Sequence, residues 1–151
     1  MASLFDTETR QQMLARVSQI TPDSQRTFGS MTPGEMICHM KDVVEIGLGE
    51  KPVTRDMPLG LIVGLGPVRS YVINKLAWPK GKLASPANQM ETAPGDFTAD
   101  VESFKTLLNR FCERGPSGEF GTHALFGKMD GKLWGALMTK HLEHHLGQFG
   151  V

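Results

Sequence analysis

Hydrophobic residues recur at steps of three and four along four long stretches of this chain, and this spacing lines one face of an α-helix. Charged and polar residues occupy the opposite face of each stretch, so each helix would pack its apolar side against the others. The four stretches are residues 7–20, 33–48, 97–114 and 130–149. The pattern therefore predicts an all-α fold in which four helices form a bundle.

Short polar residues mark where these helices begin. Asp6, Asp96 and Asp130 each precede the first apolar positions of a stretch, and a short carboxylate there accepts the free N–H groups of the first turn. The clearest start is the sequence TPGE at residues 32–35, because hydroxyl, proline and carboxylate stand where a capping box needs them.

The segment from residue 51 to residue 95 separates the second and third of these helices. Its apolar middle, residues 59–76, can form a further helix, of which residues 68–77 are the more convincing half. After it, proline and glycine predict a long surface crossover, residues 80–95, lying over the end of the bundle. Loops of this kind often supply binding residues. The predicted fold is thus a four-helix bundle with a long crossover connection.

Composition places the chain among ordinary globular proteins. Its 151 residues are 40% hydrophobic, which suffices for one domain spanning residues 1–151 with a sizeable core. Sixteen basic and sixteen acidic residues cancel, and no block of lysine and arginine stands out. This balance argues against nucleic acid or an anionic membrane surface as a partner.

Three further features bear on the compartment. Cys38 and Cys112 are far apart and form no paired-cysteine motif, which suits a reducing environment. The N-terminus lacks the apolar core of a signal peptide. The longest apolar run, residues 59–68, is shorter than the about 20 residues that cross a bilayer, and it contains three glycines and a proline. We therefore expect a soluble cytoplasmic protein.

Two histidines lie on the face of the last helix that the pattern predicts to be buried. His141 and His145 are one turn apart, and such a pair can present two imidazole nitrogens to one metal ion at about 2.0–2.1 Å. The alternative is a pair of core histidines satisfied by hydrogen bonds. Because a metal ion needs at least a third protein ligand, the metal hypothesis requires one from elsewhere in the chain.

Two other histidines have less defined surroundings. His39 lies at the border of the apolar face of the second helix, while Cys38 points about 100° away and is interpreted as an ordinary small residue. His123 falls in residues 118–129, which predict a loop without a hairpin signal. It can be a fourth ligand, a substrate contact or, as we favour, a hydrogen-bonding residue that fixes the loop.

The sequence MTPGEMICHM at residues 31–40, the long middle connection, and the sequence HALFGKMDGKLWGALMTKHLEHHLGQF at residues 123–149 resemble the DinB/YfiT-like superfamily of metalloenzymes. The resemblance is greatest to a bacterial branch of unknown function, and it extends from about residue 28 to the C-terminus. Its most specific parts are M-x-x-H, residues 36–39, and H-x-x-x-H-x-G-Q, residues 141–148.

This resemblance implies that His39, His141 and His145 converge on a divalent metal ion, namely zinc, nickel or iron, and leave coordination positions open. One difference from the family is Leu146, since many relatives have arginine at that position. The resemblance also implies a homodimer.

His144 and Gln148, the other polar residues near the end of the last helix, can each be interpreted in more than one way. His144 lies about 100° from the inward direction, so it can be a boundary histidine hydrogen-bonded to a neighbouring helix, or it can orient a ligand or relay a proton. Gln148 lies near the direction of His141 and His145, where it can accept a hydrogen bond that fixes a ring tautomer or contact a substrate.

Function follows from the resemblance and from metal chemistry. Characterised relatives include thiol-dependent S-transferases and a mycothiol-dependent maleylpyruvate isomerase, which implies transfer of a low-molecular-weight thiol to a small electrophile. An alternative is a non-catalytic, dimeric metal-binding or ligand-binding protein with a role in stress. A third hypothesis is a metal-dependent hydrolase that uses bound hydroxide.

Overall fold

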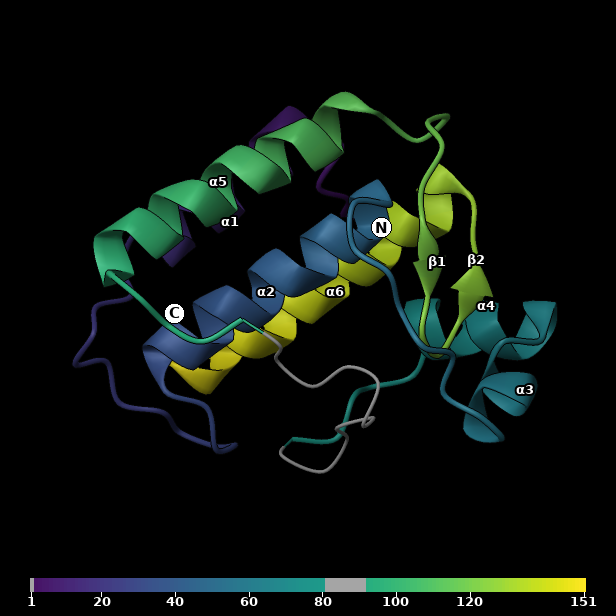
Figure 1. Ribbon diagram of the computed structural model, residues 1–151, viewed down its shortest axis with the longest axis horizontal. Helices are drawn as coiled ribbons and strands as arrows, with labels where there is room; N and C mark the ends of the chain where they lie inside the picture. Colours follow the sequence, from purple (N-terminus) through teal and green to yellow (C-terminus); the bar gives the residue numbers. More distant parts are fainter. Residues whose placement is uncertain (1, 81–91) are drawn as a thin grey trace.

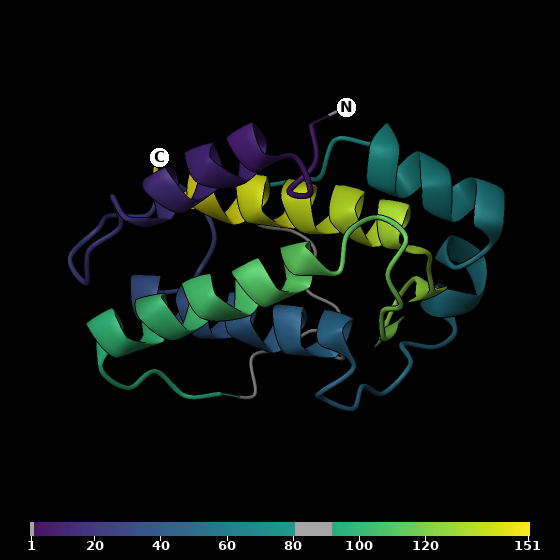
Figure 2. The same ribbon diagram turned by 90° about the horizontal axis from the view of Figure 1, so that it is seen from above.

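The computed structural model describes residues 2–80 and 92–151, and these residues are mostly helical (Figure 1). The prediction of an all-α fold is confirmed. The long helices form two layers, with α1 beside α6 and α2 beside α5 (Figure 2). Their bounds are α1 Thr7–Val17, α2 Pro33–Leu48, α5 Phe97–Glu113 and α6 Gly131–Gln148.

The predicted helix starts are confirmed. The carboxylates of Asp6, Asp96 and Asp130 each accept the backbone N–H three residues ahead, at 2.8–2.9 Å. Thr32 and Glu35 form both hydrogen bonds of a capping box. Helix α1 ends three residues before the predicted end, because the chain tightens into turns ahead of the Thr21-Pro22 sequence.

The layers meet where glycine permits close approach. A Cβ atom on Gly47 of α2 would lie 2.9 Å from the Phe111 ring and 3.2 Å from the Trp134 ring. Glycine therefore lets α2, α5 and α6 pack their aromatic residues together at this end of the molecule. The large, fully buried side chains of the core include Met36, Met40, Phe104, Phe111, Trp134, Leu137 and Met138.

The apolar middle of the chain forms two short helices, α3 Leu59–Val63 and α4 Gly66–Asn74, rather than the single predicted helix. Proline at position 67 explains the break, because its missing N–H and its ring prevent a continuous helix but fit the first turn of a new one. Several large apolar residues of this pair are exposed, including Leu61, Ile62 and Tyr71.

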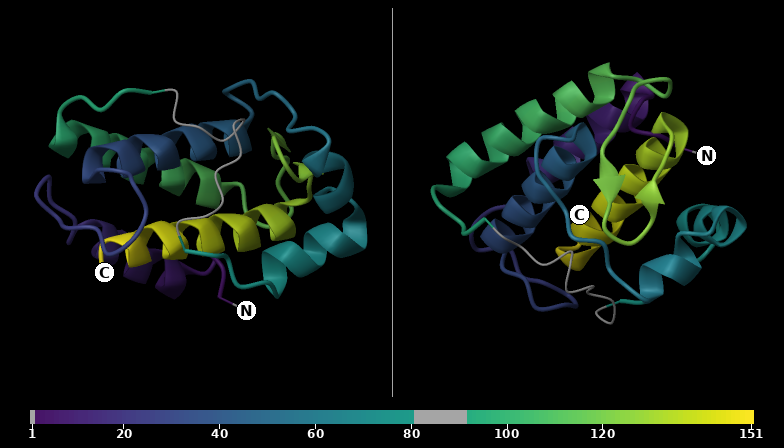
Figure 3. Two further views of the ribbon diagram at one scale, coloured as in Figure 1. Left: turned by 90° about the horizontal axis from the view of Figure 1, so that it is seen from below. Right: turned by 45° about the vertical axis from the view of Figure 1, so that its right-hand side comes forward.

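Residues 118–129 contain a small antiparallel hairpin, β1 Thr122–His123 and β2 Gly127–Lys128, where the sequence predicted only a loop. Arginines distant in sequence stabilise it. Arg55 donates to the His123 carbonyl at 2.9 Å, and Arg69 donates to the Lys128 carbonyl at 2.7 Å. The hairpin and the α3–α4 pair lie at the same end of the molecule (Figure 3).

Most of the predicted surface crossover, residues 80–95, lies outside the described residues. None of the described helices is both long and apolar enough to span a lipid bilayer.

Candidate metal centre

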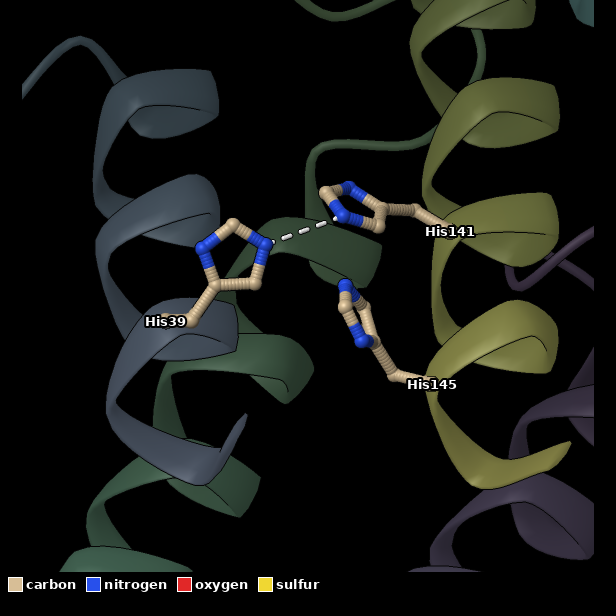
Figure 4. Close-up of side chains that lie close together, drawn as sticks. All are labelled: His39, His141 and His145. Carbon is tan, nitrogen blue, oxygen red and sulfur yellow. Dashed lines mark hydrogen bonds between the residues drawn. The ribbon is translucent and has the colours of Figure 1, made fainter. Parts of the chain in front are cut away.

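Three imidazole rings converge between α2 and α6 (Figure 4). His39 of α2 and His141 of α6 place their Nε2 atoms 3.1 Å apart. The His145 ring is centred 4.8 Å from the His39 ring and 4.7 Å from the His141 ring. One nitrogen from each of the three residues lies within 4.8 Å of the others. The residues that the sequence and the resemblance had grouped are therefore neighbours in space.

Helix geometry accounts for this convergence. The Asp130 cap sets the start of α6, and the one-turn spacing then directs His141 and His145 to the same side. His39 is itself on the buried side of α2, with Met36 and Met40 near it in the core.

Burial keeps these rings uncharged at neutral pH. His39 is 4% exposed and His145 is 6% exposed, and burial lowers the pKa of His39 to about 4 and that of His145 to about 3. The His141 ring retains some exposure, but burial of its nitrogens holds its pKa well below the ordinary value of 6.5. Its buried Nδ1 atom has no hydrogen-bond partner among the residues that the structure describes. Neutral imidazoles carry the free lone pair that a metal ligand needs.

The spacing of the nitrogens fits one small cation. Two nitrogens bound tetrahedrally at about 2.0–2.1 Å lie roughly 3.3 Å apart. His39 Nε2 and His141 Nε2, which share a hydrogen bond at 3.1 Å, have close to this separation, and one nitrogen of each of the three histidines lies within 4.8 Å of the others. Three imidazole donors suit zinc, nickel or iron rather than calcium or magnesium, which prefer oxygen ligands.

Gln148 accepts a hydrogen bond from His145. The distance between His145 Nδ1 and Gln148 Oε1 is 2.8 Å, and both side chains are buried. Because the amide oxygen can only accept, Nδ1 carries the proton and the lone pair of His145 Nε2 is free. This nitrogen is directed toward the other two rings in Figure 4. The contact is the one expected for an acceptor that fixes the ring tautomer.

The loop before α2 holds Gln148 in place. The Thr27 N–H donates to the main-chain carbonyl of Gln148 at 2.6 Å. Gly29 has a φ of +79°, and a Cβ atom there would lie 2.5 Å from Gln148 Nε2. A glycine is therefore needed for the loop to pack against the amide. Sequence reasoning missed this glycine, because a lone Gly in a polar loop gives no local signal of what it contacts.

His123 is not part of the three-histidine group. Its Nδ1 accepts hydrogen bonds from the Leu125 and Phe126 N–H groups at 3.1 and 3.2 Å. The ring also packs against Trp134, with centroids 5.6 Å apart. These contacts are those of the favoured interpretation, a residue that fixes the loop, and they leave Nδ1 unavailable to a metal ion.

His144 is half-buried on the flank of α6. The structure places aromatic rings against it, with Phe28 at 5.4 Å and Trp78 at 6.1 Å between ring centroids. The predicted hydrogen bond to a neighbouring helix is not among the described contacts, because the facing side chains are apolar rings. Apolar periodicity does not indicate which helix the Trp78 ring will contact, so its position beside His144 was not predicted.

Two other positions near the motif are structural. Leu146, where many relatives have arginine, is fully buried in the core. Cys38 is buried with its Sγ atom 3.6 Å from Asp100 Oδ2, and burial raises its thiol pKa. The thiol therefore faces α5, in agreement with its interpretation as an ordinary small residue.

Comparisons with known proteins give one result. A sequence model of a protein family, described as "Protein of unknown function (DUF1569)", matches residues 7–150. No curated protein and no solved structure matches the chain.

Proposed function

This chain belongs to the DUF1569 family of the DinB/YfiT-like superfamily, and from the site described above we propose that it binds one divalent metal ion through His39, His141 and His145. The observation that carries the proposal is the convergence of three neutral imidazoles from two helices, two of them buried and the third, His141, partly buried. Buried polar atoms in folded proteins almost always have partners. His39 Nε2 and His141 Nε2 share one hydrogen bond at 3.1 Å, and a single cation would replace it by binding these two nitrogens together with His145 Nε2.

The chain's own residues would hold the ion in a defined way. His39, His141 and His145 donate lone pairs, Gln148 keeps the His145 proton on Nδ1, and the surrounding core excludes water from one side. A divalent ion with three neutral ligands keeps its full charge, and this charge favours the thiolate form of a thiol that binds beside it.

We infer that the reaction is the transfer of a low-molecular-weight thiol to a small electrophile. A sulfur–carbon bond forms, the bond between that carbon and its leaving group breaks, and the thiol proton passes to solvent. The resemblance to thiol-dependent S-transferases and the neutral ligand set support this inference. A binding protein without turnover is the competing hypothesis.

An activity assay separates the two hypotheses. Metal-loaded protein is incubated with a panel of thiols and a chlorinated aromatic electrophile, and chloride release is measured. We expect thiol-dependent release that His141→Ala abolishes and Cys38→Ser, which removes a buried thiol of the chain, leaves unchanged. Release that survives His141→Ala would contradict the metal mechanism. Tight metal binding without release for any thiol would favour the binding protein.

A further inference from the structure

Three half-buried rings from separate segments meet beside the three histidines. Phe28 comes from the loop before α2, Trp78 follows α4, and His144 is on α6. His144 is the centre of this aromatic group, since its ring contacts Phe28 edge-on at 5.4 Å and Trp78 at 6.1 Å. Rings brought together from distant parts of a chain in this way form a wall on which a flat molecule can pack.

The aromatic group is continuous with the candidate metal centre. The Trp78 ring lies 5.6 Å from the His141 ring, and the His144 ring lies 5.3 Å from the His145 ring. Among the three converging histidines, His141 has the greatest exposure. Trp78 therefore packs against the least buried of the three histidines.

A positive charge borders this wall. The Lys80 ammonium lies 5.4 Å from the centre of the Phe28 ring, and its charge adds to burial in lowering the pKa of His144. Lys80 is exposed and has no carboxylate partner in residues 2–80 and 92–151. Lys140, which lies over Trp78, differs because it donates to the backbone carbonyls of Val72, Ile73 and Leu76 at the end of α4. Of these two lysines, Lys80 is thus the one whose ammonium makes no hydrogen bond within the described ranges.

His144 offers a hydrogen-bonding group on the same wall. In the part of the chain that the structure describes, neither of its ring nitrogens has a hydrogen-bond partner, and neither is fully buried. The wall therefore combines flat apolar faces, one imidazole and one ammonium, and the contacts described for these residues include no negative side chain.

We propose that Phe28, Trp78, His144 and Lys80 form a subsite for a flat apolar ring bearing an anionic substituent, such as an aryl carboxylate. The ring would pack on Trp78 and Phe28, and the anion would pair with Lys80 and the His144 N–H. The inference rests on the proposed function in one respect, since it assigns this ligand as the substrate that binds beside the metal centre.

Nuclear magnetic resonance of the two tryptophan indole N–H groups tests the subsite without metal. Trp78 reports on it, and Trp134 is an internal control because it is buried and donates to the Gly121 carbonyl at 3.0 Å. Benzoate and its neutral analogue benzamide are titrated into metal-free protein. We expect benzoate to shift the Trp78 signal saturably, to leave Trp134 in place, and to bind about tenfold more tightly than benzamide.

Matched lysine variants show whether the charge acts locally. Lys80→Gln should weaken benzoate binding about tenfold and leave benzamide binding unchanged, whereas Lys75→Gln, an exposed lysine at the end of α4, should change neither. Equal binding of benzoate and benzamide, equal effects of the two variants, or a Trp78 signal that neither compound moves would overturn the proposal.

Metal uptake is measured on separate portions of the same protein preparations, so the metal-centre proposal and the subsite proposal can fail independently. Benzoate binding at Trp78 in a protein that takes up no metal would contradict the metal centre and leave the subsite intact. Metal uptake in a protein whose Trp78 signal does not respond would contradict the subsite alone.

Discussion

His123 and His145 are buried to the same extent, at 6% exposure each, yet their ring nitrogens are used in opposite ways. His123 accepts two backbone N–H groups of its own hairpin loop with Nδ1. His145 donates with Nδ1 to Gln148, and its other nitrogen faces two more imidazoles. Burial lowers the pKa of both, so neither burial nor pKa distinguishes a structural histidine from a candidate ligand. The partners of each nitrogen do.

The surroundings of His123 and of the three-histidine group also differ in the free energy that it costs to bury their ring nitrogens. On folding, His123 Nδ1 exchanges hydrogen bonds to water for hydrogen bonds to two backbone N–H groups. The three-histidine group, by contrast, leaves His141 Nδ1 without a partner among the described residues. A buried polar atom without a partner costs about 1–3 kcal/mol. Local cost of this kind is common where a protein keeps residues for binding rather than for stability.

The largest expected effect is the loss of stability in acid, which both environments should share. Burial lowers the pKa of His39 and His123 from 6.5 to about 4, so the unfolded chain binds protons first as the pH falls. Their contribution to the free energy of unfolding is therefore complete above pH 6.5 and is lost as the pH approaches 4. It amounts to about 3 kcal/mol for each residue.

Urea unfolding of metal-free protein at pH 7, 6 and 5 measures this dependence. His123→Ala should reduce the slope of unfolding free energy against pH, because one of the depressed groups is gone. A slope that is the same in the variant and the wild type would mean that His123 is not held neutral by burial.

The second prediction separates the two environments. His145→Ala should lower zinc affinity by more than about 100-fold, because losing a residue that only supports a ligand already costs about 10–100-fold. His123→Ala should leave zinc affinity unchanged and instead destabilise the fold by about 2 kcal/mol or more, because the buried Phe126 N–H and the part-buried Leu125 N–H lose their acceptor. Competition with a chromophoric chelator gives the affinities, and urea unfolding gives the stabilities. Equal losses of zinc affinity in both variants would remove the distinction.

The third prediction concerns the residue that fixes the His145 tautomer. Gln148→Leu should weaken zinc binding about 10–100-fold, because His145 Nδ1 loses its acceptor. Gln148→Glu keeps an acceptor oxygen at that position and should recover most of the affinity. If leucine and glutamate behave alike, the hydrogen bond does not support the ligand.

The smallest expected effect comes from the outer face of the same helix. Glu143, between His141 and His145 in sequence, is exposed and pairs with Arg16 at 2.8 Å. Glu143→Gln should change the free energy of unfolding by no more than about 0.5 kcal/mol and leave zinc affinity unchanged, because exposed ion pairs contribute little. A clear loss of zinc in this variant would show that the metal responds to charge on α6 rather than to the inward-facing ligands.

Local sequence signals predicted the frame of the site well. The caps of α1, α2, α5 and α6 involve residues within one turn of each other, and the one-turn spacing of His141 and His145 is likewise local. His39 is different, because no pattern within α2 indicates which residues of α6 it will face. Only the resemblance to a known superfamily connected the two helices.

The parts that were not predicted depend on contacts between distant residues. The hairpin requires Arg55 and Arg69, and the aromatic group requires Trp78 to pack against His144, more than 60 residues later in the sequence. The break between α3 and α4, by contrast, follows from Pro67, which is a local signal. The prediction of a single helix over residues 59–76 gave more weight to apolar periodicity than to this proline.

The most direct test of the central claim is elemental analysis of protein purified without an affinity tag and loaded with zinc, nickel or iron. Wild type and His123→Ala are compared with His39→Ala, which removes the one candidate ligand on α2. We predict close to one metal ion per chain in the first two proteins and almost none in the third. Wild-type protein that takes up no metal, or His39→Ala that keeps as much as the wild type, would contradict a metal centre shared by α2 and α6.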